Sequence, residues 1–120
     1  MIVGHVRDGF PRITLALPGL NGLLQVEFVL DTGFEGELTL PENLLREIDA
    51  DFVATQTMLM ADDSERRTRH FQIVLEWNEE ARFTEVIALE GRPLLGNLLL
   101  EGCGVQIEMT DGGEVVVEFK

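Results

Sequence analysis

An aspartate at the end of an apolar run is the feature of this chain best suited to chemistry. In the stretch VLDTGFEG, Val29 and Leu30 lead directly into Asp31, Thr32 and Gly33. One interpretation is a turn that ends a strand, because Asp, Thr and Gly are common turn residues. The other is a carboxylate that an apolar strand holds at the edge of the core, where it can act on a substrate as a general acid or base.

Composition and charge limit the classes of protein to which this chain can belong. The chain has 120 residues, of which 45% are apolar, which suits one domain over residues 1–120 with its own core. Its net charge of −13 argues against nucleic-acid binding, because a phosphate-binding surface needs clustered Lys and Arg, and against an anionic membrane surface. The lone cysteine, Cys103, can form no internal disulfide, which favours a reducing compartment. Since the N-terminus also lacks a signal pattern, we expect a cytoplasmic domain with no nucleic-acid or membrane partner.

Most of the sequence is typical of short strands separated by turns. Strands are predicted where β-branched and aromatic residues cluster, over residues 12–17, 23–30, 52–60, 67–77, 83–90, 104–109 and 114–119. A helix is predicted over residues 41–50, because its leucines share one face at helical spacing. Residues 91–102 suit either a strand or a short helix. These patterns predict an all-β fold, a small closed β-barrel or a sandwich with one or two short helices.

The order of motifs along the chain is also informative. After Asp31 come a short helix, a hairpin with a polar tip between Met58 and Phe71, and then Leu94-Leu95-Gly96 followed by a second short helix and a strand. This order resembles the retropepsin-like, single-domain aspartic proteases. The stretch DTGFEGELTLP is similar to bacterial members of that family, and LLGNLLLEGCGVQIEM is similar to the Gly-Asn-Leu-Leu helix and final strand of retroviral proteases. The resemblance covers most of the chain, from the first strand to the last.

The resemblance implies an aspartic endopeptidase in which Asp31 is catalytic. Two carboxylates held close together share one proton, so one can activate a water while the other polarises the scissile carbonyl. The chain holds only one Asp-Thr-Gly, so a second copy must supply the other aspartate, and we expect a homodimer acting on a polypeptide. Two alternatives stay open. One is a catalytically inactive dimer of the same fold that serves binding or assembly, and the other is an unrelated β domain that binds a small ligand.

The resemblance also assigns roles to other residues. Support of the active-site loop is expected from Thr32, Gly33, Leu94, Leu95 and Gly96. Substrate binding is expected from Gly33, Phe34 and Glu35, and from the hairpin tip, which would act as a flap, at Met60, Ala61, Asp62 and Asp63. Phe34 departs from the small residue usual at that position in retroviral enzymes, and the acidic tip departs from their glycine-rich flap.

The remaining candidates concern nearby acids, the dimer and metals. Glu35 and Glu37 are close enough in sequence to contact substrate or raise the proton affinity of the dyad, with a solvated face as the alternative. The dimer interface is expected to contain Val115, Val116, Val117 and Phe119, unless this tail closes the barrel of a monomer. No cofactor or metal is expected, because His5 and His70 have no further ligand at metal-site spacing.

Overall fold

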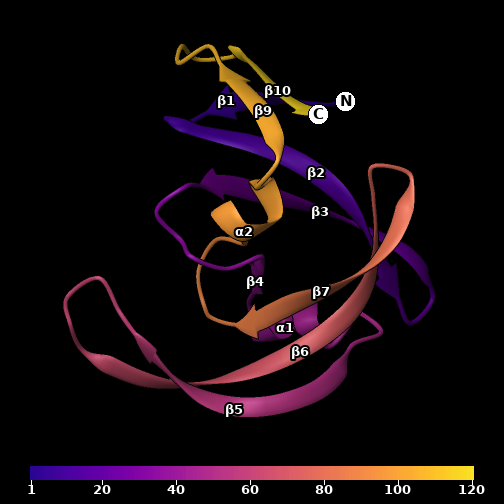
Figure 1. Cartoon of the computed structure of the whole chain (residues 1–120), viewed down its shortest axis with the longest axis vertical. Coiled ribbons are helices and arrows are strands. Elements are labelled where there is room, and N and C mark those ends of the chain that lie inside the picture. Colours follow the sequence, from indigo (N-terminus) through magenta and orange to yellow (C-terminus); the bar gives the residue numbers. More distant parts are fainter.

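The fold is a single sheet of ten strands. The structure, a computed structural model, describes all 120 residues. The strand order is β5-β6-β7-β4-β8-β3-β2-β1-β10-β9 (Figure 1). The all-β class expected from the sequence is confirmed. The closed barrel is not formed, because β5 and β9 end the sheet and do not pair with each other; β5 instead belongs to a hairpin that projects from the body.

Strands and two short helices follow one another along the chain. Their bounds are β1 Ile2–Arg7, β2 Phe10–Gly19, β3 Gly22–Asp31, β4 Leu38–Leu40, α1 Glu42–Leu45, β5 Asp51–Leu59, β6 Glu65–Trp77, β7 Glu80–Ala88, β8 Leu94–Gly96, α2 Asn97–Leu100, β9 Cys103–Ile107 and β10 Glu114–Phe119. Neither helix is long and apolar enough to cross a bilayer.

The helix predicted over residues 41–50 is shorter than expected. Only Glu42–Leu45 is helical, with no side-chain cap at its start. Beyond it, Ile48 forms an isolated bridge with Gly19, and the amide of Asp49 donates to the carbonyl of Pro18 at 2.8 Å. Hydrogen bonds to the β2–β3 hairpin therefore replace the helical bonds that the second turn would have made.

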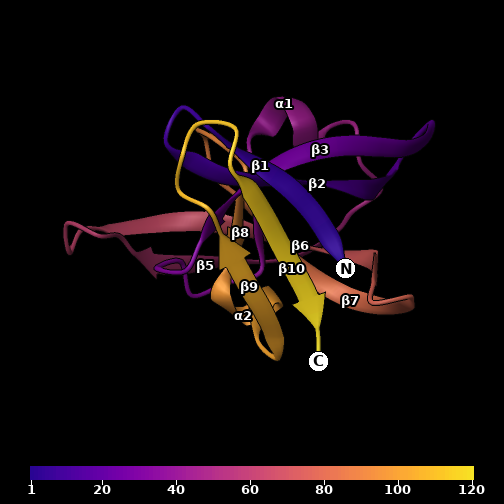
Figure 2. The ribbon, with the colours of Figure 1, turned by 90° about the horizontal axis from the view of Figure 1, so that it is seen from above.

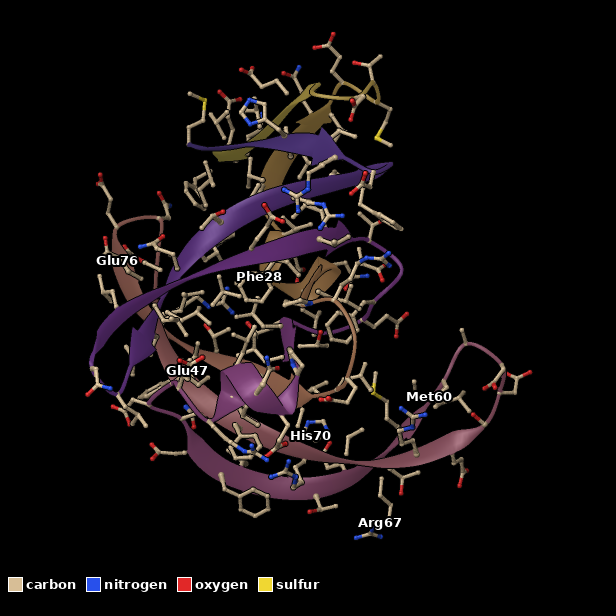
Figure 3. The ribbon with its side chains drawn as sticks, turned by 180° about the vertical axis from the view of Figure 1, so that it is seen from behind. Phe28, Glu47, Met60, Arg67, His70 and Glu76 are labelled. Atoms are coloured by element: carbon tan, nitrogen blue, oxygen red, sulfur yellow. The ribbon has the colours of Figure 1, made fainter.

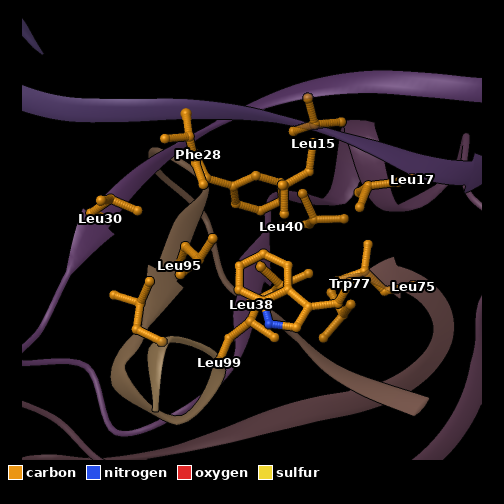
Figure 4. Packing of buried hydrophobic residues seen from close by; sticks show 14 of the residues in the cluster. Leu15, Leu17, Phe28, Leu30, Leu38, Leu40, Leu75, Trp77, Leu95 and Leu99 are labelled. Atoms are coloured by element: carbon orange, nitrogen blue, oxygen red, sulfur yellow. The ribbon is translucent and has the colours of Figure 1, made fainter. Parts of the chain in front are cut away.

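The main core lies on one side of the sheet. Alternate residues of a strand point to the same face, and Ile13, Leu15 and Leu17 of β2 are all buried in it. Phe28 of β3 is fully buried and shares this core with side chains from β4, β6, β8 and α2 (Figure 4). At one end of the sheet, β1 and β10 run antiparallel beside each other, with both termini nearby (Figure 2). Because Phe28 and Leu30 of β3 point into the core, the residues that alternate with them, including Asp31, lie on the opposite face of the sheet.

Candidate functional site

Asp31 is the last residue of β3, at the point where two parallel strands meet. Its backbone pairs with Gly96 of β8, and Leu30 pairs with Leu95. Leu95 is also paired with Leu38 of β4 on its other side. The Asp31 loop, residues 32–37, thus leaves the sheet after β3 and returns to it across β8. This arrangement anchors both ends of the loop in the buried part of the sheet.

The loop begins with a turn that the aspartate itself makes. The Asp31 Oδ1 accepts a hydrogen bond from the amide of Gly33 at 3.0 Å. The amide of Phe34 donates to the Asp31 carbonyl at 3.2 Å. The structure gives the carboxylate no other protein partner, and the side chain is only partly buried. The Asp31 carboxylate therefore forms the turn through Oδ1 and still has an oxygen without a protein partner, so the two interpretations do not exclude each other.

Phe34 is buried inside the loop. Its side chain is 8% exposed, and its ring lies against two glycines, Gly36 and Gly96. A Cβ at Gly36 would lie 2.3 Å from the ring Cζ, and one at Gly96 would lie 2.6 Å from Cδ2. Phe34 was expected to contact substrate, and the structure places its ring inside the loop, where it is almost fully buried. The bulky side chain is accommodated because both neighbours lack one.

The start of α2 closes the other side of the loop. The amide of Asn97 donates to the Phe34 carbonyl at 3.0 Å, and that of Leu98 donates to the Gly36 carbonyl at 3.1 Å. The Asn97 side-chain Nδ2 lies 3.3 Å from the carbonyl of Thr32. Backbone donors at the start of a helix have no partner within it, so the loop carbonyls satisfy them. Sequence reasoning did not single out Asn97, although the Gly-Asn-Leu-Leu motif contains it.

The residues predicted to support the loop are brought together. Leu95 is fully buried beneath it, and Gly96 donates its amide to the Glu37 carbonyl at 2.8 Å. The amide of Leu94 donates to the Oγ1 of Thr39 at 2.9 Å. Thr39 is almost fully buried and was also missed, because a lone threonine within an apolar strand carries no distinctive sequence signal.

The two nearby glutamates have different surroundings. Glu37 accepts a hydrogen bond from the backbone amide of Glu85 at 3.0 Å and forms an ion pair with Arg82. Both partners belong to β7, so the Glu37 carboxylate ties the loop to that strand and is not free for a ligand. Glu35 is exposed and carries no such contact.

The β5–β6 hairpin ends in a tight turn. The amide of Asp63 donates to the Met60 carbonyl at 3.0 Å, and Asp63 has a left-handed backbone with φ 65°. Asp62 accepts hydrogen bonds from the hydroxyl and the amide of Ser64, which lower the pKa of the Asp62 carboxyl. Ala61, Asp62 and Asp63 are exposed and Met60 is partly buried. The tip lies on the same side of the molecule as the Asp31 loop and projects beyond it (Figures 1 and 3). No hydrogen bond or ion pair joins tip and loop.

The C-terminal tail lies within the chain's own sheet. Val115 and Val117 are fully buried in the core, and β10 pairs with β1 on one side and β9 on the other. Val116 and Phe119 are partly buried, and Phe119 packs edge-on against Trp77 with ring centroids 5.1 Å apart. The side chains of Val115 and Val117 therefore pack within their own chain. This placement matches the alternative in which the tail belongs to a single chain.

An apolar surface adjoins the Asp31 loop on the α2 side. A shallow hollow there is lined by Thr32, Asn97, Leu98, Cys103 and Val105, among others. The Leu98 side chain is 51% exposed. Burial raises the pKa of the Cys103 thiol, and Glu101 is the one acidic residue of the lining. This surface, unlike the buried faces of β10, is open to a partner.

Histidine and acidic side chains form no metal cluster. No group of three or more His, Cys, Asp or Glu residues is placed to hold an ion. His70 is buried, with its Nε2 2.8 Å from the Thr68 hydroxyl and its Nδ1 3.2 Å from a carboxylate oxygen of Glu85. These contacts place the His70 ring between Thr68 of β6 and Glu85 of β7.

Comparison of the chain with protein-family models, with curated proteins and with solved structures finds no match.

Proposed function

We propose that this chain is a cytoplasmic aspartic endopeptidase with a retropepsin-like fold, active as a homodimer with one Asp31 from each copy. The observation that carries this proposal is the setting of Asp31. The carboxylate ends an apolar strand, lies on the face opposite the core, and is held by a loop that β8 and α2 brace from below. Such a setting keeps the backbone rigid while leaving the acid open to a second carboxylate and a substrate.

The chemistry requires two carboxylates that share one proton. The ionised one takes a proton from an attacking water, and the protonated one donates a hydrogen bond to the scissile carbonyl. Because the pair titrates as one unit, activity is expected to follow a bell-shaped pH profile with its optimum in mildly acidic solution. The substrate would be an extended polypeptide lying between the Asp31 loop and the β5–β6 hairpin.

The partner surface is proposed to be the hollow beside Thr32 and Leu98. It adjoins the Asp31 loop directly and exposes an apolar side chain there. Two copies joined across it would bring their Asp31 loops toward each other. Val116 and Phe119 remain candidates for the edge of such an interface.

Peptide cleavage by the purified chain tests the proposal. Asp31→Asn keeps the size of the side chain but removes the ionisable oxygen, so it should abolish cleavage of a peptide library without changing the unfolding midpoint. Asp49→Asn, at an exposed aspartate outside the site, is the matched control and should cleave normally. A statine inhibitor, which mimics the tetrahedral transition state, should block the unsubstituted chain. Cleavage that survives Asp31→Asn would refute the assignment, whereas a dimer without any cleavage would favour the binding module.

A further inference from the structure

A cationic and aromatic cluster lies on the same face of the sheet as Asp31. We call it the Phe10 rim and define it as Phe10, Arg12 and Arg92. The Arg92 guanidinium lies 4.4 Å from the centre of the Phe10 ring, and that of Arg12 lies 5.8 Å from it. These distances are within the range of cation–π attraction, so the ring holds the guanidinium of Arg92 in place.

Strand register places the rim beside the aspartate. Arg12 of β2 is directly opposite Val29 of β3, so their side chains share a face. Phe10 and Asp31 each lie two residues from that pair, and residues two apart on a strand point the same way. Phe10 and Asp31 therefore share this face with Arg12 and Val29.

The apolar floor of this face connects the rim to the aspartate. Val29 is 6% exposed yet does not belong to the main core cluster, because it lies on the other side of the sheet. It pairs with Leu94 of β8, and its amide donates to the Pro93 carbonyl at 2.9 Å. Arg92 immediately precedes Pro93, so the segment that carries this arginine is anchored to the strand that ends in Asp31.

Of the two arginines of the rim, Arg92 is the one whose charge has no ionic partner. Arg92 is exposed and forms no ion pair, in a chain whose net charge is −13. Arg12 forms a 3.4 Å ion pair with Glu27, whose carboxylate binds Arg7 more closely, and its Nε donates to the Arg7 carbonyl at 3.3 Å. The ring covers one face of the Arg92 guanidinium but leaves its N–H edge free, and that edge is the part that binds a carboxylate with two parallel hydrogen bonds.

We propose that the Phe10 rim binds an acidic side chain of the polypeptide substrate, within about two residues of the bond that Asp31 attacks. The inference rests on the proposed function and adds a substrate class to it. The distance follows from strand register, because Arg12 lies opposite Val29, about 7 Å along β3 from Asp31, and an extended peptide has the same repeat. Arg92 is placed by its contact with Phe10, which lies two residues beyond Arg12 toward the level of Asp31. Arg92 is the residue that would determine this preference, and Arg12 would add to the local positive potential.

Binding and cleavage are measured separately to test the inference. Fluorescent peptides that carry Glu, Gln or Lys at each of three positions on either side of a cleaved bond are titrated with the Asp31→Asn chain, which binds without turnover. We expect the Glu peptide to bind about fivefold more tightly than the Gln peptide at one of these positions, and the preference to fall at high salt. Arg92→Gln should remove the preference, and Arg92→Lys, which keeps the charge but not the paired donors, should retain part of it. Arg46→Gln removes the same charge at another exposed arginine without an ion pair and should change nothing.

Each outcome bears on one of the two proposals. Cleavage by the unsubstituted chain without any preference for Glu overturns the inference and leaves the protease standing. A preference for Glu that survives Arg92→Gln also overturns it. Binding of Glu peptides that depends on Arg92, with no cleavage by the unsubstituted chain, supports the rim and refutes the protease. Absence of both binding and cleavage overturns both.

Discussion

The backbone of Asp31 lies directly opposite that of Gly96 in the parallel pairing of β3 with β8. This one pairing joins the acid to the segment that supports its loop. Gly96 has no side chain, so the Phe34 ring and the Gly36 carbonyl can both approach it closely. The candidate site therefore depends on glycines as much as on the acid.

Gly96→Ala should destabilise the fold strongly. The new Cβ would lie 2.2 Å from the backbone oxygen of Gly36 and 2.7 Å from that of Phe34, and backbone atoms cannot move aside as a flexible side chain can. We expect a loss of about 1–3 kcal/mol or more in the free energy of unfolding, measured by urea denaturation. Gly33→Ala is the control within the same loop, because its Cβ would meet only the Asp31 Oδ1, at 3.3 Å. Equal urea midpoints for the two variants would contradict this account of the loop.

Phe34 and Gly36 should be coupled. Phe34→Ala removes a buried ring and should cost about 3–5 kcal/mol. Gly36→Ala should also destabilise the chain, because the three nearest atoms to its Cβ all belong to the Phe34 ring, the closest at 2.3 Å. When Phe34→Ala has removed the ring, the methyl group that Gly36→Ala adds occupies the vacated space. The double variant should therefore be more stable than the sum of the single losses predicts, by at least about 1 kcal/mol. Strict additivity in the unfolding data would mean that the ring and the glycine do not touch.

Glu27 should contribute to stability only above acidic pH. Arg7 hydrogen-bonds to the Glu27 carboxylate through two contacts, one of them at 3.1 Å. This hydrogen bonding is the main cause that lowers the pKa of the Glu27 carboxyl, and the charges of Arg7 and Arg12 act in the same direction. A carboxyl whose pKa is lower in the folded state stabilises the fold above its unfolded pKa, and this contribution disappears as the pH falls through the folded value. Because the pair is largely exposed, Glu27→Gln should cost less than about 1 kcal/mol at pH 7.

A matched variant separates this pair from the general effect of charge. Removing any carboxylate from a chain of net charge −13 relieves repulsion, so Glu76→Gln, at an exposed residue of β6 without an ion pair, is the reference (Figure 3). The difference between the two variants in urea unfolding should be present at pH 7, shrink as the pH falls below the ordinary Glu pKa of about 4.3, and vanish once the pH is below the lowered pKa of the folded state. A difference that does not shrink on acidification would show that the ion pair is not its source.

Leu98→Asp should separate the proposed dimer without unfolding the chain. Leu98 is half-exposed on α2 beside Thr32, so a charge there is tolerated by one chain but would be buried in the proposed interface. Sedimentation equilibrium should show a dimer for the unsubstituted chain and a monomer for the variant, with peptide cleavage lost in parallel. Leu23→Asp, at a more exposed leucine on β3, is the control and should leave the association unchanged. A monomer at concentrations that still cleave peptide would refute the dyad formed by two chains.

Deleting the C-terminal tail is a poor test of association. Residues from Glu114 onward include Val115 and Val117, whose side chains fill the core, and β10 is paired on both sides. Their loss would unfold the chain whether or not it forms a dimer. The surface variant at Leu98 avoids this ambiguity.

Local sequence patterns determined much of the secondary structure of this protein. Clusters of apolar residues predicted most of the strands, though not β4, and polar and glycine clusters predicted the turns. The apolar run before Asp31 predicted that a strand ends there. These features depend on neighbours in the sequence, and the backbone preferences of a few residues are enough to specify them. The same patterns failed where contacts from elsewhere compete, as in the helix that ends at Leu45 because Ile48 and Asp49 bond to the β2–β3 hairpin.

Tertiary structure alone decided which side chains meet at the site. An alternating strand such as β10 shows that one face will be buried, but not whether its own core or a second chain will cover it. Phe34 was expected to contact substrate, yet it fills the loop, because Gly36 and Gly96 come together only when β3 and β8 pair. The contact of Arg92 with Phe10 beside Asp31 has the same origin. Such contacts join residues far apart in the chain, and they form only where the burial gained over the whole sheet offsets the entropy lost in closing the long loops between them.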